Sequence, residues 1–213
     1  MKFSLPRVYP LTDVELSGHS HADQVHLLSL GGATLIQLRE KRLPALQFYE
    51  QARAALAVAK RSGVLLIVND RVDVALAAGA QGVHLGQDDM PPEAARRLLG
   101  DEVVIGYSTH SVEQARHALT LPIDYIAIGP IFETASKSDT SPTLGLDGLR
   151  AVRTTVGNVP LVAIGGISHS NAGAVIEAGA DSVAVISAVL SDRDEIADAT
   201  RTLLQSLPPP RQT

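Results

Sequence analysis

Polar and charged side chains recur directly after short apolar segments of this sequence. Gln37, Arg39 and Lys41 follow one such segment at intervals of two residues, so all three would point the same way if the strand continues. Burying two unpaired cations costs several kcal/mol, and a bound anion would offset that cost. The spacing therefore predicts an anion site.

Two acidic positions follow the next two apolar segments. Asp70 stands after Asn69, and Asp89 stands four residues after Leu85. Either aspartate alone could cap the helix that follows it. Together, beside Arg39 and Lys41, they are typical of oxygen ligands for Mg²⁺, which takes one or two carboxylates plus substrate phosphates. Asp88 could replace Asp89 in this role.

A second set of residues suits a phosphate group. Gly165 and Gly166 end the apolar run Val162–Ile164, and Ser187 ends a later one. The glycine pair could be only a tight turn. In a barrel, however, the loops after the seventh and eighth strands commonly hold a phosphate on main-chain N–H groups.

A polar loop runs from Thr134 through Ser136 and Lys137 to Gly145. It is either a flexible surface loop or a lid that supplies hydroxyls and an ammonium group to phosphate oxygens. Two anion subsites result, one with cations and a metal, the other with glycines and a serine. Together they favour displacement of a Mg²⁺-bound diphosphate from carbon, in which stabilising the departing charge is the main catalytic term.

The histidines give little support for a metal centre. His19, His21 and His26 lie near one another without partner carboxylates at helical spacing, and we expect them to be solvated surface residues. His84 lies inside an apolar run and is expected to be a packed or hydrogen-bonded structural residue. His110 lies near the expected site mouth, behind the residues that touch ligand.

The elements that must position these residues alternate regularly. The expected strands are Val8–Leu11, Thr34–Leu38, Val64–Val68, Val83–Leu85, Val103–Gly106, Tyr125–Ile128, Leu161–Ile164 and Ser182–Ile186. The clearest expected helices are Leu46–Arg61, Glu93–Leu99, Val112–Leu119, Asn171–Glu177 and Asp194–Leu204. Apolar strands separated by helices predict a parallel sheet. About eight units predict an α/β fold, a single-domain (β/α)8 TIM barrel with the site at the C-terminal ends of its strands. A doubly wound open sheet would need fewer strands and one dominant glycine-rich turn.

An internal echo supports the barrel. The segment Ala78–Val83 resembles Ala178–Val183, and in the expected strand order this pairs the fourth strand with the eighth. Each copy would end a helix with a left-handed glycine, although any helix-to-strand turn could select such residues. Residues 1–206 are expected to form one domain, and residues 207–213, with three consecutive prolines, a disordered tail.

Composition excludes several classes of function. The 213 residues contain no cysteine, so disulfides, thiolate metal sites and cysteine nucleophiles are excluded. A net charge of −5 and 3% aromatic residues argue against nucleic acid and anionic membranes as partners. We see no secretion signal or membrane-spanning run, and expect a cytoplasmic enzyme with small-molecule substrates. A homo-oligomer is left open.

Six segments together resemble the thiamine phosphate synthase (thiamine-phosphate pyrophosphorylase) family, over residues 9 to about 189. They are Gln37–Lys41, Asn69–Arg71, His84–Asp89, Gly106–His110, Gly129–Lys137 and Val162–Ile167. The resemblance implies a transferase that joins hydroxymethylpyrimidine diphosphate to a thiazole phosphate, giving thiamine phosphate and pyrophosphate. It also implies a dissociative reaction: pyrophosphate leaves first, and the thiazole nitrogen captures the pyrimidine cation.

The resemblance also assigns residues by position. The implied catalytic residues are Arg39, Lys41, Ser108 and Lys137. The implied substrate-binding residues are Gln37, Arg39, Lys41, Asn69, Ser108, Thr134, Ser136, Lys137, Gly166, Ile186 and Ser187. Asp70 and Asp89 would bind Mg²⁺, the one implied cofactor. The family more often has Thr where Ser136 stands, which keeps the hydroxyl.

Two other functions compete with this one. A thiazole tautomerase-like branch, or another phosphate-binding barrel isomerase, would lack pyrophosphate chemistry. In that branch the position of Pro130 tends to be His, and the metal carboxylates are missing. A non-catalytic phosphate sensor would not need to activate a leaving group. Pro130, Asp70 and Asp89 favour the synthase.

Overall fold

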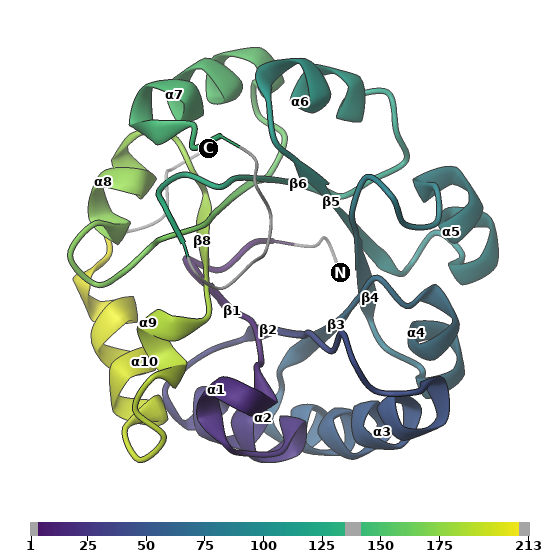
Figure 1. The fold of residues 1–213 in the computed structure, drawn as a ribbon. Coiled ribbons are helices and arrows are strands. Elements are labelled where there is room, and N and C mark those ends of the chain that lie inside the picture. The colour runs from purple at the N-terminus through teal and green to yellow at the C-terminus, as the bar shows by residue number, and fades with distance from the viewer. Residues whose placement is uncertain (1–3, 135–141, 209–213) are drawn as a thin grey trace.

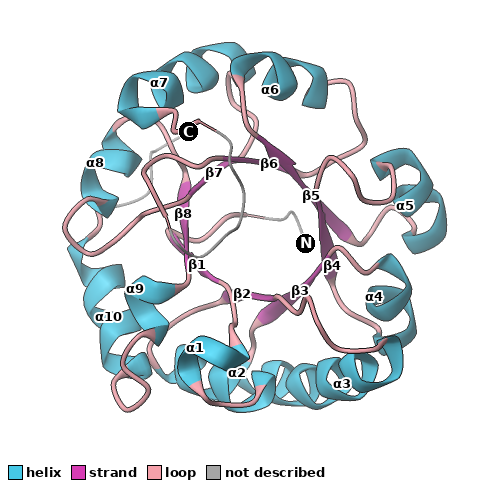
Figure 2. Ribbon diagram, in the orientation of Figure 1, coloured by secondary structure: helices cyan, strands magenta, loops and turns pink. Residues whose placement is uncertain are grey.

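Eight parallel strands form a ring with helices around its outside (Figure 1). The structure is a computed structural model that describes residues 4–134 and 142–208. The strands are β1 (Val8–Pro10), β2 (Leu35–Leu38), β3 (Leu65–Asn69), β4 (Gly82–Leu85), β5 (Val104–Thr109), β6 (Tyr125–Ile128), β7 (Leu161–Ile164) and β8 (Ser182–Val185). The helices in the described ranges are α1 (Val14–Ser17), α2 (His21–Leu30), α3 (Ala45–Ser62), α4 (Val72–Ala78), α5 (Pro92–Leu99), α6 (Val112–Ala118), α7 (Gly145–Val156), α8 (Ala172–Glu177), α9 (Ser187–Leu190) and α10 (Ile196–Ser206). Figure 2 shows the same ring with its strands in magenta.

The sheet confirms the predicted (β/α)8 barrel. Strands β2 to β8 pair in chain order, and β1 pairs with β8. The ring closes just beyond β1, where Leu11 forms a parallel bridge with Gln37 and the Thr12 amide donates to the Gln37 carbonyl at 2.9 Å. Strand order therefore never reverses at a switch point, which rules out the doubly wound alternative.

The strands could be predicted as apolar runs because they are buried on both faces. All residues of β2, β4, β6 and β8 are buried, because the barrel interior covers one face and the helices cover the other. Strand β5 extends to Thr109, beyond the predicted end at Gly106, since Ser108 and Thr109 still pair with β6. Main-chain pairing thus continues where the side chains become polar.

The helices turn one face toward the strands. In α3 the buried side chains are Phe48, Ala52, Ala55, Leu56 and Ala59, at helical spacing. No helix within the described ranges is long and apolar enough to cross a bilayer. Of the tail expected at 207–213, residues 209–213 lie outside the described part of the chain.

The sequence echo marks two equivalent turns on strands β4 and β8. Gly79 and Gly179 both adopt positive φ, at 74° and 127°. Two residues later, the side chains of Gln81 and Asp181 each accept a hydrogen bond from a main-chain amide of the preceding strand, at 3.1 and 2.9 Å. The expected left-handed glycine cap is found only in the first copy, where Gly79 caps α4; helix α8 is capped by Ala178 in a right-handed conformation. The two copies therefore share the side-chain contact to the preceding strand but not the way in which the helix ends.

Arg153 of α7 ties together the N-terminal end of the barrel. Its guanidinium group donates to the carbonyls of Gly179 (2.8 Å), Val159 (3.0 Å) and Gly157, and to Asp181 Oδ2 (2.6 Å). The same Asp181 oxygen accepts from the first amide of β7. Charge-assisted, branched bonding of this kind needs the fork of an arginine.

We expect Arg153→Lys to lower the free energy of unfolding by about 1–3 kcal/mol, because a lysine leaves partly buried carbonyls without donors. Urea denaturation measures this. Arg150→Lys on the exposed face of the same helix is the matched control and should change stability by less than about 0.5 kcal/mol. Equal effects of the two variants would show that the Arg153 network adds nothing.

Candidate active site

Two adjoining cavities open at the C-terminal ends of the strands. The wide cavity has a volume of about 630 Å³; its polar lining comes from β1 to β5 and the loops after them, including Gln37, Arg39 and Asn69, and apolar residues of β6 to β8 complete it. The narrow cavity, about 50 Å³, lies between the turns that follow β5 to β8. Ser108 and His110 line both cavities. Two ligands bound side by side would meet at this shared wall.

The cationic side of the wide cavity follows β2. This strand ends at Leu38, yet Gln37, Arg39 and Lys41 all line the cavity, as the spacing predicted. The expectation that both cations are unpaired is wrong. Lys41 Nζ lies 2.5 Å from Asp70 Oδ2, and Arg39 lies 3.9 Å from the carboxylate of Asp13. An anion must therefore share these cations with carboxylates.

Asp70 holds an unusual backbone conformation. Its φ is 61°, the only positive value outside glycine in the described part of the chain. This conformation costs an Asp about 1–3 kcal/mol. The N-cap of α4 is Arg71 rather than Asp70, so the capping alternative is wrong. The carboxylate instead faces Lys41 in the wide cavity.

Asp89 lies half-buried close to Asp70. Its Oδ2 accepts a hydrogen bond from the Gly86 amide at 2.6 Å. Helix α5 begins after Pro91, so Asp89 does not cap it either. Burial, together with the neighbouring Asp70 carboxylate, raises the pKa of Asp89. Asp88 is exposed, so the two candidate positions for the metal ligand, Asp88 and Asp89, which the sequence could not separate, differ in their burial.

Asn69 supplies a donor without an acceptor. Its side chain is 6% exposed, and Nδ2 has no hydrogen-bond partner among residues 4–134 and 142–208. A buried donor in this condition costs about 1–3 kcal/mol. Because Asn69 lines the wide cavity at the end of β3, a ligand oxygen would remove that cost.

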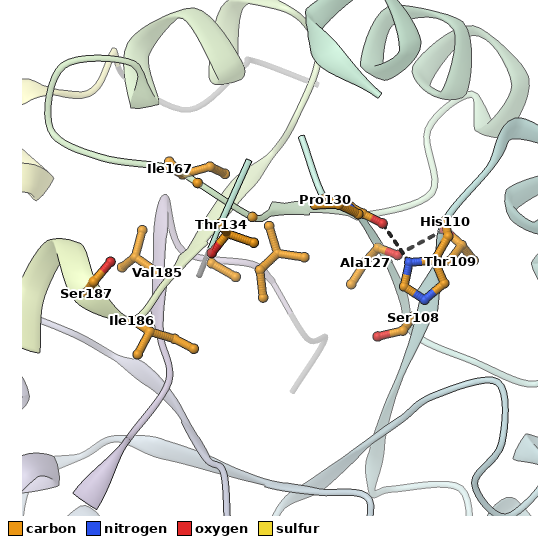
Figure 3. A pocket seen from close by; sticks show the side chains of 15 residues that line it. Ser108, Thr109, His110, Ala127, Pro130, Thr134, Ile167, Val185, Ile186 and Ser187 are labelled. Atoms are coloured by element: carbon orange, nitrogen blue, oxygen red, sulfur yellow. Dashed lines mark hydrogen bonds between the residues drawn. The ribbon is translucent and has the colours of Figure 1, made fainter. Parts of the chain in front are cut away.

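The narrow cavity is built from turns. Figure 3 shows Ser108 and His110 on one side of it, Ile186 and Ser187 on the other, and Thr134 between them. His110 Nδ1 lies 2.6 Å from the Gly129 carbonyl, which can only accept, so this nitrogen carries the proton.

Gly165 and Gly166 form the tightest part of the narrow cavity. Gly165 has φ 103° and Gly166 has φ 63°. A Cβ atom on Gly166 would lie 2.4 Å from the Glu133 carbonyl oxygen, so no larger residue fits this turn. Of the other predicted residues, Ser136 and Lys137 lie in 135–141, outside the described residues.

Some residues near the site were missed or misread in the sequence. Tyr9, His84 and Gln87 also line the wide cavity. The prediction for His84 as a hydrogen-bonded residue is confirmed, since Nε2 lies 2.8 Å from Ser108 Oγ. A histidine inside an apolar run was the available signal for His84, whereas Tyr9 gave none.

The prediction that His21 is a surface residue is wrong. The side chain is 1% exposed, Nδ1 lies 2.7 Å from Thr12 Oγ1, and Nε2 lies 3.6 Å from Glu40. The Thr12 hydroxyl also accepts from the Arg39 amide at 3.2 Å. His21 therefore supports, from behind, the segment that carries Arg39 and Lys41.

Comparisons with known proteins agree with one another. Residues 8–189 match the family model described as thiamine monophosphate synthase. A thiamine-phosphate synthase of Chloroflexus aurantiacus is 48% identical over 198 residues, which are 92% of this chain and 90% of that protein. One from Koribacter versatilis is 47% identical over 95% of this chain and 97% of its own.

Solved structures give the same result. A thiamine phosphate pyrophosphorylase from Pyrococcus furiosus superposes with a TM-score of 0.85 at 38% identity, over 94% of each chain. A 3-hexulose-6-phosphate synthase, at 17% identity and a TM-score of 0.67, shares the fold alone.

Burial of His21 leads to a testable pH dependence. Burial lowers the pKa of His21 below its usual 6.5, with Glu40 opposing in part. Below pH 6.5 the unfolded chain binds a proton at His21 that the folded chain does not bind. The contribution of neutral His21 to the free energy of unfolding is therefore complete above pH 6.5, and it is lost as the pH falls toward the pKa of the folded state.

The difference in unfolding free energy between wild type and His21→Gln should therefore shrink as the pH is lowered from about 7.5 to about 5.5. Urea denaturation at each pH measures it. His26→Gln, exposed on the same helix, is the control. A difference that stays constant for His21→Gln would contradict this account.

Proposed function

The chain belongs to the thiamine monophosphate synthase family and is an enzyme of that type, and we propose that it joins hydroxymethylpyrimidine diphosphate to a thiazole phosphate, releasing pyrophosphate. The observation that carries this proposal is the buried, unpartnered Nδ2 of Asn69. It lies in a cavity lined by two cations and three carboxylates, which is the chemistry that a metal-bound diphosphate needs.

In this proposal the diphosphate occupies the wide cavity. Arg39, Lys41 and Asn69 would donate to its oxygens, together with Lys137. Ser108, on the wall shared by the two cavities, would donate to the same group. Gln37 would contact either the pyrimidine or the diphosphate. The cavity volume suits a drug-sized ligand of this kind.

Asp70 and Asp89 would hold Mg²⁺. The fit is supported by their donor chemistry: two neighbouring carboxylates, one with a raised pKa that a cation would reverse. No group of three or more metal-binding side chains gathers within the described ranges, which agrees with an ion completed by phosphate oxygens and water. When bound, Mg²⁺ would supply charge neutralisation to the departing diphosphate.

The chain's residues would then stabilise departing charge. The C–O bond to the diphosphate breaks and its electron pair leaves with the oxygen, toward Arg39 and Lys41. The amino group of the pyrimidine stabilises the methylene cation. The thiazole nitrogen attacks with its own lone pair, so no side chain needs to act as an acid or base. Positioning and electrostatics supply the catalysis.

The thiazole phosphate would occupy the narrow cavity. Thr134 and Ser136 would donate hydroxyls, and Gly166 and the Ile186–Ser187 turn would offer main-chain amides. The cavities share Ser108 and His110, so a thiazole in one would lie beside a pyrimidine in the other. That arrangement would bring nucleophile and cation into contact without a covalent intermediate on the protein.

A coupling assay tests the reaction. We expect the folded protein to release pyrophosphate only when both substrates and Mg²⁺ are present. Asp89→Ala should reduce the rate on the order of 100-fold while circular dichroism stays unchanged. Asp88→Ala, at the exposed neighbouring position, is the control and should retain most activity. Folded wild-type protein without pyrophosphate release would overturn the proposal, and loss confined to Asp88→Ala would move the metal ligand there.

Asn69→Ala should separate binding from stability. It removes a donor to a charged ligand, so the Kd for Mg²⁺-pyrophosphate should rise roughly 10- to 100-fold in calorimetry. The free energy of unfolding of the unliganded protein should stay the same or rise, because an unpartnered buried donor is lost. Asn158→Ala, exposed at the far end of the barrel, should change neither quantity. Lower stability with unchanged affinity would mean that Asn69 serves the fold.

A further inference from the structure

Four hydrogen bonds in series cross the interior of the barrel. Gln37 Nε2 lies 3.0 Å from the Tyr9 hydroxyl, which lies 3.0 Å from the Tyr125 hydroxyl. The Tyr125 hydroxyl lies 2.9 Å from His84 Nδ1, and His84 Nε2 lies 2.8 Å from Ser108 Oγ. Strands β2, β1, β6, β4 and β5 each contribute one member. We call this set the interior chain.

The interior chain has a direction. The amide nitrogen of Gln37 can only donate, so the Tyr9 hydroxyl accepts from it and donates its own hydrogen bond to the Tyr125 hydroxyl. Burial raises the pKa of both tyrosines above the usual value of 10, so both keep their protons at neutral pH. Tyr125 therefore donates to His84 Nδ1. The imidazole then carries its proton on Nε2 and donates to Ser108.

We propose that the interior chain orients the Ser108 hydroxyl as a hydrogen-bond donor into the shared wall of the two cavities, which makes Tyr9, Tyr125 and His84 positioning residues for Ser108. Ser108 Oγ accepts from His84, so its own proton is directed away from the imidazole, toward the cavity. On the proposed function, on which this inference rests, that proton meets an oxygen of the departing diphosphate.

Packing holds the rings of the interior chain in place. Tyr9 and Tyr125 meet edge to face at 6.0 Å, and the His84 ring stacks on Tyr125 at 5.5 Å. Gly106 makes room for this pair, since a Cβ there would lie 2.0 Å from Tyr125 Cζ and 2.5 Å from His84 Nδ1. The rings therefore have little freedom to move into an arrangement in which the hydrogen bonds run in the opposite direction.

A spectroscopic measurement tests the direction without any substrate. In protein labelled with ¹⁵N-histidine, the His84 signals, assigned by their loss in His84→Gln, should show a proton on Nε2 and none on Nδ1 at neutral pH. A proton on Nδ1, alone or with Nε2, would overturn the proposal, because Ser108 would then face its partner as donor or the chain would be broken. This result is independent of whether the protein performs the coupling reaction.

A kinetic measurement tests the consequence. Tyr125→Phe removes one hydroxyl from the chain and should lower kcat on the order of 10-fold, with KM for both substrates changed less than about twofold. Tyr49→Phe on α3, outside the chain, is the matched control and should leave kcat unchanged. In Tyr125→Phe the His84 signals should also show a partial population with the proton on Nδ1.

The double variant decides whether the effect passes through Ser108. Adding Tyr125→Phe to Ser108→Ala should not slow the enzyme further. An additional 10-fold loss in that background would contradict the relay and indicate a structural role. If Tyr125→Phe does not fold, Tyr9→Phe removes the hydroxyl that links Gln37 to Tyr125. It should likewise lower kcat and partly populate the His84 tautomer with its proton on Nδ1. Failure of wild-type coupling would overturn the proposed function, while the tautomer would still decide this inference.

Discussion

A buried polar group without a partner costs free energy, and inside this barrel one hydrogen-bonded chain joins polar side chains from five of the eight strands. They satisfy one another across the ring, from Gln37 to Ser108, and this is possible only when the ring is closed. Asn69, at the same level of the barrel, keeps a donor unpaired. The rest of the site depends on this difference. The hydrogen-bonded side chains from Gln37 to Ser108 form a fixed layer beneath the wide cavity, while polar groups that lack a partner or share one face the cavity itself.

The two ends of the barrel differ in how their charged side chains are bonded. At the N-terminal end, Arg153 and Asp181 form hydrogen bonds with main-chain groups of neighbouring elements, so that end contributes stability. At the C-terminal end, Asp70 is held at positive φ and faces Lys41, while Asp89 carries a raised pKa. Such strained and shifted groups are tolerated because the scaffold beneath them is rigid. A ligand that brings a cation and phosphate oxygens would relieve both.

The sequence predicted much of this arrangement because its signals are local. Eight apolar runs located eight strands, and residues following those runs located most of the cavity lining. The contacts between distant strands could not be read. Tyr9 and Tyr125 meet across a ring that closes only in three dimensions, and nothing near either residue indicates the other. His21 was misread for the same reason, since its neighbour Glu40 lies on the loop after β2 and not close to His21 in the sequence. Asp70 and Asp89 resembled helix caps, and only the backbone geometry shows that they are not.

The central claim is that the wide cavity binds a metal-bound diphosphate through Asn69, Lys41 and the two aspartates. A crystal structure of the protein soaked with Mg²⁺ and pyrophosphate tests it most directly. The account predicts diphosphate density within hydrogen-bond distance of Asn69 Nδ2 and Ser108 Oγ, with the ion between Asp70 and Asp89. Diphosphate density at the Gly165–Gly166 turn, with the wide cavity left empty, would contradict it.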